Sequence, residues 1–281
     1  MKRRIWIATG VVVVIVAVGI FWLTRPRGAD PISEADAVES FRETEGSAAG
    51  SDGSDSTTST TATDGEDGGS ATPTPGVYSY ATTGREVVKL GPLPAETRDF
   101  PETTTAAVTT SASTDDSQLC FDYKLNLIEQ HTEDTTWCRS EGGALRFASY
   151  AKHQSVAQFN PTVNIACDPS IVWEAGIDSQ DLSCDLTLDG GPMEVTTEVT
   201  GTSVSSPPES LEVGDGASVE VIPVAMNFDL EGSVSGTWSE KLWLDARSML
   251  PVKIERSFRL EGFATFDEQS TLVLQSTEPN R

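Results

Sequence analysis

Residues 222–231 read IPVAMNFDLE, and in this stretch large apolar side chains alternate with polar ones. An extended chain with this alternation presents one apolar face and one face to water. Pro223 removes a backbone donor, which is typical of an edge strand or a bulge. The apolar side is formed by Ile222, Val224, Met226, Phe228 and Leu230.

The same period of two recurs along the second half of the chain. It is clear at residues 121–127, 193–199 and 252–260, and glycine- or proline-rich turn signals separate the runs. Strands with one wet face and short turns indicate antiparallel pairing. We therefore expect an all-β domain of about ten to twelve strands and no secure helix. The expected fold is a meandering antiparallel sheet that forms a curved half-barrel, a closed barrel or a sandwich.

One stretch is ambiguous by local pattern. Residues 238–250 place Leu242, Trp243, Ala246 and Leu250 at helical spacing. Pro251 follows, and the flanks on both sides alternate. We therefore predict strand, turn and strand here.

The charge of the chain excludes several classes of function. The 281 residues include 43 acidic and 19 basic side chains, for a formal net charge of -24, and only two histidines. Nucleic-acid binding needs a basic face, and anionic lipid headgroups repel a chain of this charge. We expect no nucleic-acid partner and an acidic, non-enzymatic protein.

Residues 5–23, IWIATGVVVVIVAVGIFWL, contain no charge. As a helix they span roughly 28 Å, close to the thickness of a hydrocarbon core. Residues 1–4 then form a basic cytoplasmic stub, and the rest of the chain lies outside the cytoplasm. The expected location is therefore the cell membrane, with a single-pass signal anchor. Cleavage before Ala29, as in a signal peptide, is the competing interpretation.

Residues 28–76 are rich in Gly, Ser, Thr and acidic side chains. Such a segment buries too little apolar surface to order itself, so we expect a disordered acidic stalk. As a coil its ends would lie roughly 40 Å apart. Ser33 and Asp36 form a weak capping box, which allows one or two amphipathic turns. Residues 77–281 are then one extracytoplasmic β domain.

Four cysteines in an exported domain predict two disulfides. Three pairings are possible. We favour Cys120 with Cys138 and Cys167 with Cys184, because each closes a short loop across a local pair of strands. The sequence contains no Cys-x-x-Cys pair, so it gives no indication of a zinc site.

A search for catalytic motifs yields no candidate. Val234 stands where a Gly-x-Ser-x-Gly elbow needs its serine. The acidic series around Cys184 lacks the spacing of a calcium loop. We expect no catalytic residue, no cofactor and no metal, and we expect His131 and His153 to be exposed. Four tryptophans could line a groove but fit a β core better: Trp137, Trp173, Trp238 and Trp243.

Residues 241–255, KLWLDARSMLPVKIE, resemble the strand, turn and strand near the carboxyl end of LolA-like and LppX/LprG-like envelope lipoproteins. The matching residues are Trp243, Leu244, Asp245, Leu250, Pro251 and Val252. The resemblance implies an open, curved half-barrel that holds lipid or acyl chains on its concave side. This chain departs from those families because it lacks their plugging helices and an anchoring cysteine after the apolar run. Its layout also resembles exported proteins of high-GC Gram-positive bacteria, which implies a location and no activity.

Two functions follow as hypotheses. The first is a membrane-anchored module that binds a lipid or another apolar ligand in a curved sheet. The second is a structural ectodomain with a filled core, which meets a protein or wall polymer. An apolar cavity of several hundred Å³ would favour the first. Phe228 is the position that we expect to face such a ligand.

Overall fold

The computed structural model describes residues 29–49, 72–111, 118–190 and 195–281. Almost all of this is β-structure, and the strands follow one another along the chain with short connections. The elements are α2 Glu34–Ala49, β1 Gly76–Leu90, β2 Glu96–Asp99, β3 Thr103–Ser111, β4 Gln118–Ile128, β5 His131–Ser140, β6 Leu145–Gln154, β7 Thr162–Cys167, β8 Ile171–Trp173, β9 Ser179–Asp189, β10 Val195–Ser205, β11 Glu209–Glu212, β12 Ser218–Gly232, β13 Ser235–Asp245, β14 Pro251–Glu261 and β15 Ala264–Leu274.

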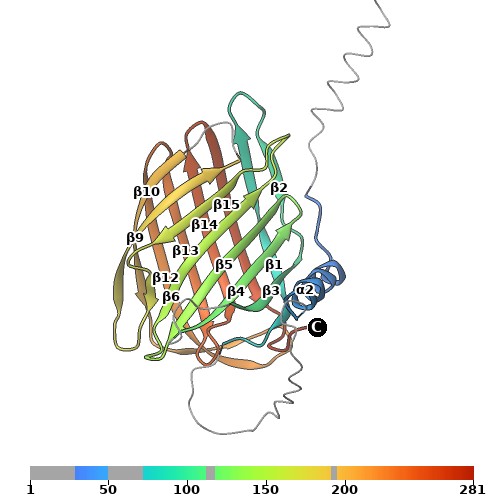
Figure 1. The fold of residues 1–281 in the computed structure, drawn as a ribbon, viewed down its shortest axis with the longest axis vertical. Helices are drawn as coiled ribbons and strands as arrows, with labels where there is room; N and C mark the ends of the chain where they lie inside the picture. The colour runs from blue at the N-terminus through green and yellow to red at the C-terminus, as the bar shows by residue number, and fades with distance from the viewer. Residues whose placement is uncertain (1–28, 50–71, 112–117, 191–194) are drawn as a thin grey trace, which may run out of the picture.

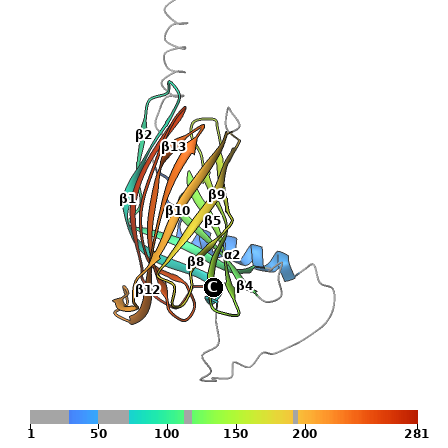
Figure 2. The ribbon, with the colours of Figure 1, turned by 90° about the vertical axis from the view of Figure 1, so that its left-hand side faces the viewer.

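The sheet closes into an antiparallel barrel of twelve strands. The strands pair in the order β10, β9, β7, β6, β5, β4, β3, β1, β15, β14, β13, β12, and a further pairing of β10 with β12 completes the circle. Figure 2 shows β1 and β13 in one wall and β5 and β9 in the other. Of the three expected architectures, the closed barrel is therefore the one that forms.

The strand count exceeds the expected ten to twelve because three very short strands pair outside this circle. β2 pairs with β1, β8 with β6, and β11 with β12. Each has only three or four residues, too few to produce a visible alternation in the sequence.

Two ends of the barrel can be distinguished in Figure 1. We call the mouth the end that carries the β1–β2, β12–β13 and β14–β15 turns, and we call the opposite end the base. Alternate side chains of each strand point inward, as β9 shows with buried Leu182, Cys184 and Leu186 between exposed neighbours. The alternation of apolar and polar residues in the sequence therefore corresponds to side chains that point alternately into and out of the barrel.

The ambiguous segment 238–250 is strand, turn and strand, as predicted. β13 ends at Asp245, whose carboxylate accepts hydrogen bonds from the backbone N–H groups of Arg247 and Ser248, both at 2.7 Å. Met249 takes a positive φ of 64°, and Pro251 begins β14. The side chain of Asp245 thus stabilises a turn where the local pattern allowed a helix.

Helix α2 corrects part of the expected stalk, because residues 34–49 are ordered against the barrel. Ser33 Oγ accepts the N–H of Asp36 at 3.1 Å, so the capping box forms. Ala37 and Phe41 are buried together with Val77 at the start of β1. The helix is stabilised by this tertiary contact, which a weak amphipathic pattern did not predict.

The remaining stalk residues 50–71 and the predicted anchor 5–23 lie outside the described residues. Within the ranges that the structure describes, no helix has the length and apolar character to cross a membrane.

Both predicted disulfides are confirmed. Cys120 bonds to Cys138 and Cys167 to Cys184. Each pair occupies directly opposite positions in neighbouring strands, β4 with β5 and β7 with β9. The pairing follows from the strand order, as the sequence argument supposed.

A cluster of aromatic side chains fills much of the interior. Neighbouring ring centroids lie 4.8 to 6.2 Å apart. Phe228 is stacked on Trp238 at 4.8 Å and is 2% exposed, so it belongs to this core and does not face a ligand. The full cluster is Trp137, Phe147, Tyr150, Phe228, Trp238, Phe258 and Phe266.

Candidate functional site

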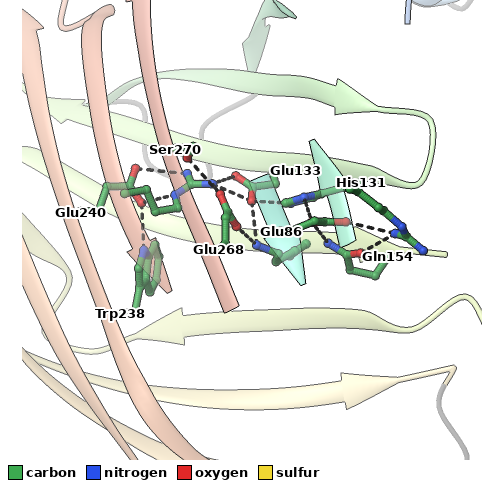
Figure 3. Close-up of polar contacts among 11 residues, drawn as sticks. Glu86, His131, Glu133, Gln154, Trp238, Glu240, Glu268 and Ser270 are labelled. Carbon is green, nitrogen blue, oxygen red and sulfur yellow. Dashed lines mark hydrogen bonds and ion pairs between the residues drawn. The ribbon is translucent and has the colours of Figure 1, made fainter. Parts of the chain in front are cut away.

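A set of buried charged and polar side chains lies inside the barrel, within hydrogen-bonding reach of one another (Figure 3). On β1, β13, β14 and β15 the charged residue occupies an inward position whose neighbours two residues away are apolar or small, whereas β5 and β6 each contribute two polar residues at this spacing. We call this set the buried charge network. Its members are Glu86, Arg98, His131, Glu133, Lys152, Gln154, Glu240, Arg256 and Glu268.

Arg256 of β14 connects one half of the network. Its Nη1 donates to both carboxylate oxygens of Glu133, at 2.7 and 2.6 Å, and lies 3.4 Å from Glu268. Its Nε and Nη2 donate to Glu240 at 3.0 and 3.3 Å. Trp238 Nε1 also donates to Glu240, at 3.0 Å, which ties the network to the aromatic core.

Lys152 and His131 connect the other half. Lys152 Nζ lies 2.6 Å from Glu268 and 3.2 Å from Glu133, and it stands 4.2 Å from the ring centroid of Phe266. His131 Nδ1 lies 2.6 Å from Glu86, and Nε2 lies 2.8 Å from Glu133. Because both ring nitrogens face carboxylates, the imidazolium with two N–H donors is the form that fits.

Arg98 closes the network on the side of β2. Its Nη1 donates to Glu86 at 3.1 Å, and its Nη2 donates to the carbonyl of Ser155 at 2.7 Å. Gln154 Nε2 donates to Glu86 at 3.2 Å. Glu96, which is partly exposed, accepts from Arg98 Nε at 3.0 Å.

With all four buried carboxylates ionised, the charges of the buried members balance when His131 is protonated. Four carboxylates, of Glu86, Glu133, Glu240 and Glu268, face the three cations Arg98, Lys152 and Arg256. The imidazolium supplies the fourth positive charge. Uncompensated charge is costly in a low dielectric, so the geometry favours the protonated ring.

The pKa shifts of His131 and Glu86 agree with this balance, whereas that of Glu240 opposes it. Burial disfavours the imidazolium and Lys152 repels it, but Glu86 and Glu133 outweigh both, so the pKa of His131 is raised from 6.5. Burial alone would raise the pKa of Glu86, yet His131, Lys152 and Arg98 lower it to about 2. Burial raises the pKa of Glu240 even though Arg256 opposes it.

One group within the network has the composition of a metal site. A ligand atom from each of His131, Glu133 and Glu268 lies within 4.8 Å of the others. The ammonium of Lys152, however, already lies at hydrogen-bonding distance from both carboxylates. A cation would therefore have to displace Lys152, and we assign no metal to this group.

Above the network lies a cavity of about 290 Å³, which we call the mouth cavity. Its wall is mainly apolar and comes from strands and turns far apart in the sequence, including Val88, Val156, Val163, Leu188, Leu260 and Phe266. Lys152 and Gln154 form part of its lining, where it meets the network. Phe263, 48% exposed, stands at its rim in the β14–β15 turn.

One sequence expectation for this region is wrong, and the interpretation of the tryptophans is confirmed. His131 was expected to be exposed and is fully buried, because the residues HTED begin β5 instead of forming a turn. His153 is partly exposed and pairs with Asp134 at 2.8 Å. Trp137, Trp238 and Trp243 are buried, as the core interpretation predicted, and Trp173 is partly buried against the same core.

Sequence reasoning missed the buried charge network, although a signal was present. Arg256 occupies the apolar phase of residues 252–260, and Glu240 stands between Trp238 and Leu242 at the same spacing. A charged residue in the apolar phase of a strand has to be paired inside. Comparison of the chain with protein-family models, curated proteins and solved structures gives no match.

Proposed function

We propose that the barrel is a binding module for an apolar ligand, which the mouth cavity holds, and that residues 5–23 anchor it outside the cytoplasm. The mouth cavity is the observation that supports this proposal. Its volume of about 290 Å³ is at the lower end of the range for ligand pockets. A protein interior otherwise leaves few voids larger than a water molecule. An apolar cavity of this size is therefore unusual, and a bound ligand explains it.

The inner wall of the cavity indicates how the ligand is oriented. Lys152 and Gln154 are already paired with carboxylates of the network. An anionic group placed beside them would add a fifth negative charge to a balanced set. The inner end of the ligand is therefore uncharged, and its polar end remains at the mouth.

The role that we infer is non-enzymatic. His131 would be the natural general base, but both of its nitrogens are held by carboxylates. The arginines and Lys152 are likewise committed to partners inside the barrel. The network supports the wall of the cavity and keeps the two halves of the barrel together.

The second candidate is the structural or interaction ectodomain, in contact with a protein or wall polymer. The aromatic cluster favours it, because its large rings fill much of the interior of the barrel. Under this hypothesis the mouth cavity is an unused gap.

Purified full-length protein in detergent decides between the two. We expect native mass spectrometry to detect a co-purified apolar molecule, and a neutral dye such as N-phenylnaphthylamine to bind the emptied protein. Leu260→Trp fills the mouth cavity and should abolish both signals. The matched variant Leu119→Trp, at an exposed position at the start of β4, should retain them. Absence of ligand and dye from the wild-type protein would favour the filled-core alternative.

A further inference from the structure

The chain just before α2 is fixed to the β4–β5 turn by three hydrogen bonds. The carbonyl of Asp30 accepts from the N–H of Glu129 at 2.8 Å. The N–H of Asp30 donates to Gln130 Oε1 at 3.1 Å, and Gln130 Nε2 donates back to Asp30 Oδ2 at 2.7 Å. Ala29 also packs against the main core. Asp30 is thus a fixed point on the barrel.

This fixed point lies on the side of the mouth. The carbonyl of Gln130 accepts from the N–H of Ser155 at 2.8 Å. Ser155 stands between Gln154 and Val156, which both line the mouth cavity. Only one residue and one hydrogen bond therefore separate Gln130 from the wall of the cavity.

From Asp30 the chain runs toward the base. Phe41 of α2 is buried with Val77, at the base end of β1, whereas Val88 at the other end of β1 lines the mouth cavity. Glu34 is held by Ser79 and Asn280, at 2.9 and 2.6 Å. Figure 1 shows the blue segment descending to α2 along the lower half of the barrel. What precedes residue 29 therefore joins the barrel on its mouth side.

We infer that the barrel lies close to the bilayer with its mouth toward the membrane, and that its ligand is the acyl chain of a membrane lipid. This inference rests on the proposed anchor and on the proposed use of the mouth cavity. Six residues lie between Leu23 and Asp30, and the seven steps along the chain allow the two to be at most about 25 Å apart. The mouth is therefore within reach of the lipid surface whatever path those residues take.

The acidic segment does not lengthen this distance. Residues 50–71 connect α2 to β1, and both of these elements are docked on the same barrel. The segment is then an insertion within the domain and not a spacer between membrane and domain. This reverses its expected role as a stalk.

The covalent connection, and not charge, holds the mouth near the lipid, because an acidic domain is repelled by anionic headgroups. Two large apolar side chains are exposed at the mouth, Leu93 at 40% and Phe263 at 48%. Phe263 is tied to the β1–β2 turn, since its carbonyl accepts from Gly91 at 2.9 Å. Leu119 and Ile177 are similarly exposed but lie toward the base, which provides matched controls.

The test uses the full-length protein in liposomes, with the photoreactive residue benzoylphenylalanine in place of Phe263 or of Ile177. Mass spectrometry after irradiation measures lipid adducts. We expect several-fold more adduct at position 263. Equal adducts at the two positions, a higher yield at 177, or recovery of a membrane-free protein that starts near Ala29 would each overturn the inference.

A second pair of variants separates an insertion from a stalk. A flexible Gly/Ser segment of about 20 residues is inserted after Arg27 or after Ser59. We expect the first to lower the adduct yield at position 263 and the second to leave it unchanged. An equal loss from both insertions would restore the stalk. Dye binding in detergent, measured on the same variants, tests the mouth cavity independently of its orientation.

Discussion

Arg256 of β14 and Glu133 of β5 are 123 residues apart in sequence and meet inside the barrel, where one guanidinium nitrogen donates to both carboxylate oxygens. The two strands are not neighbours in the sheet. The ion pair therefore joins β5 in one wall of the barrel to β14 in the other, across the interior.

Replacing Arg256 by Met should destabilise the domain strongly. The change leaves Glu133, Glu240 and Glu268 without their shared cation, and breaking a buried pair costs about 3 to 5 kcal/mol. For a domain of this size the melting temperature should fall by about 6 to 20 °C. Arg259→Met is the matched control on the same strand, because Arg259 is 65% exposed in its pair with Glu261 and should matter little. Equal melting temperatures for the two variants would show that the network contributes nothing to stability.

Stability should fall as the pH rises through the neutral range. The pKa of His131 is raised in the folded state, so its contribution is complete below 6.5 and is lost as the pH passes the folded value. Glu86 acts in the opposite direction, because its pKa of about 2 means that its contribution is lost only in strong acid. Thermal melts from pH 6 to 10 should show the decline. His131→Gln should flatten it, and an unchanged decline in that variant would show that His131 is not the group responsible.

Each disulfide should stabilise the domain separately. The loops closed by Cys120–Cys138 and Cys167–Cys184 have sequence separations of 18 and 17, for which the chain-entropy model gives roughly 3 kcal/mol per bridge. Reduction should therefore lower the melting temperature by more than about ten degrees. Non-reducing peptide maps should recover these two linked pairs. A crossed linkage would contradict the order of β4, β5, β7 and β9.

Helix α2 should detach when its buried face is disrupted. Phe41→Ala removes most of the side chain that packs on Val77, a change that costs about 3 kcal/mol or more in a core. Hydrogen exchange in residues 34–46 should then accelerate by roughly a hundredfold, while the barrel strands retain their protection. Glu39→Ala, on the exposed face, is the control. Unchanged exchange in Phe41→Ala would mean that the helix is held by its polar contacts with the carboxyl terminus.

The sequence predicted the strands because their alternation has a direct physical cause. Residues 222–230 and 252–260 each have to present one face to water, and the same phase relation appears in β12 and β14. The disulfides were predictable for a similar reason, since consecutive cysteines fall in strands that pair locally.

The candidate site was not predictable in the same way. The mouth cavity is formed by strand residues together with three separate connections, which contribute Val156, Val234 and Phe263, and their proximity depends on how the barrel closes. His131 looked like part of a polar turn because one of its partners, Glu86, lies on β1, 45 residues away in sequence, and only Glu133 is a near neighbour on β5. The alternation of residues along one strand does not predict which strand faces it across the interior of the barrel.

The pairing of β1 with β15 sets a condition on how this protein is made. Eleven residue pairs, from Tyr80 with Leu274 to Leu90 with Ala264, join the first strand to the last. Until residue 274 has left the ribosome, β1 has one unpaired edge and β14 has another. Such edges are sites of misassociation, and contacts this distant in sequence form slowly. The emerging chain therefore passes through a stage in which two sheet edges are unpaired, and a chain that stops before Ala264 remains in that stage.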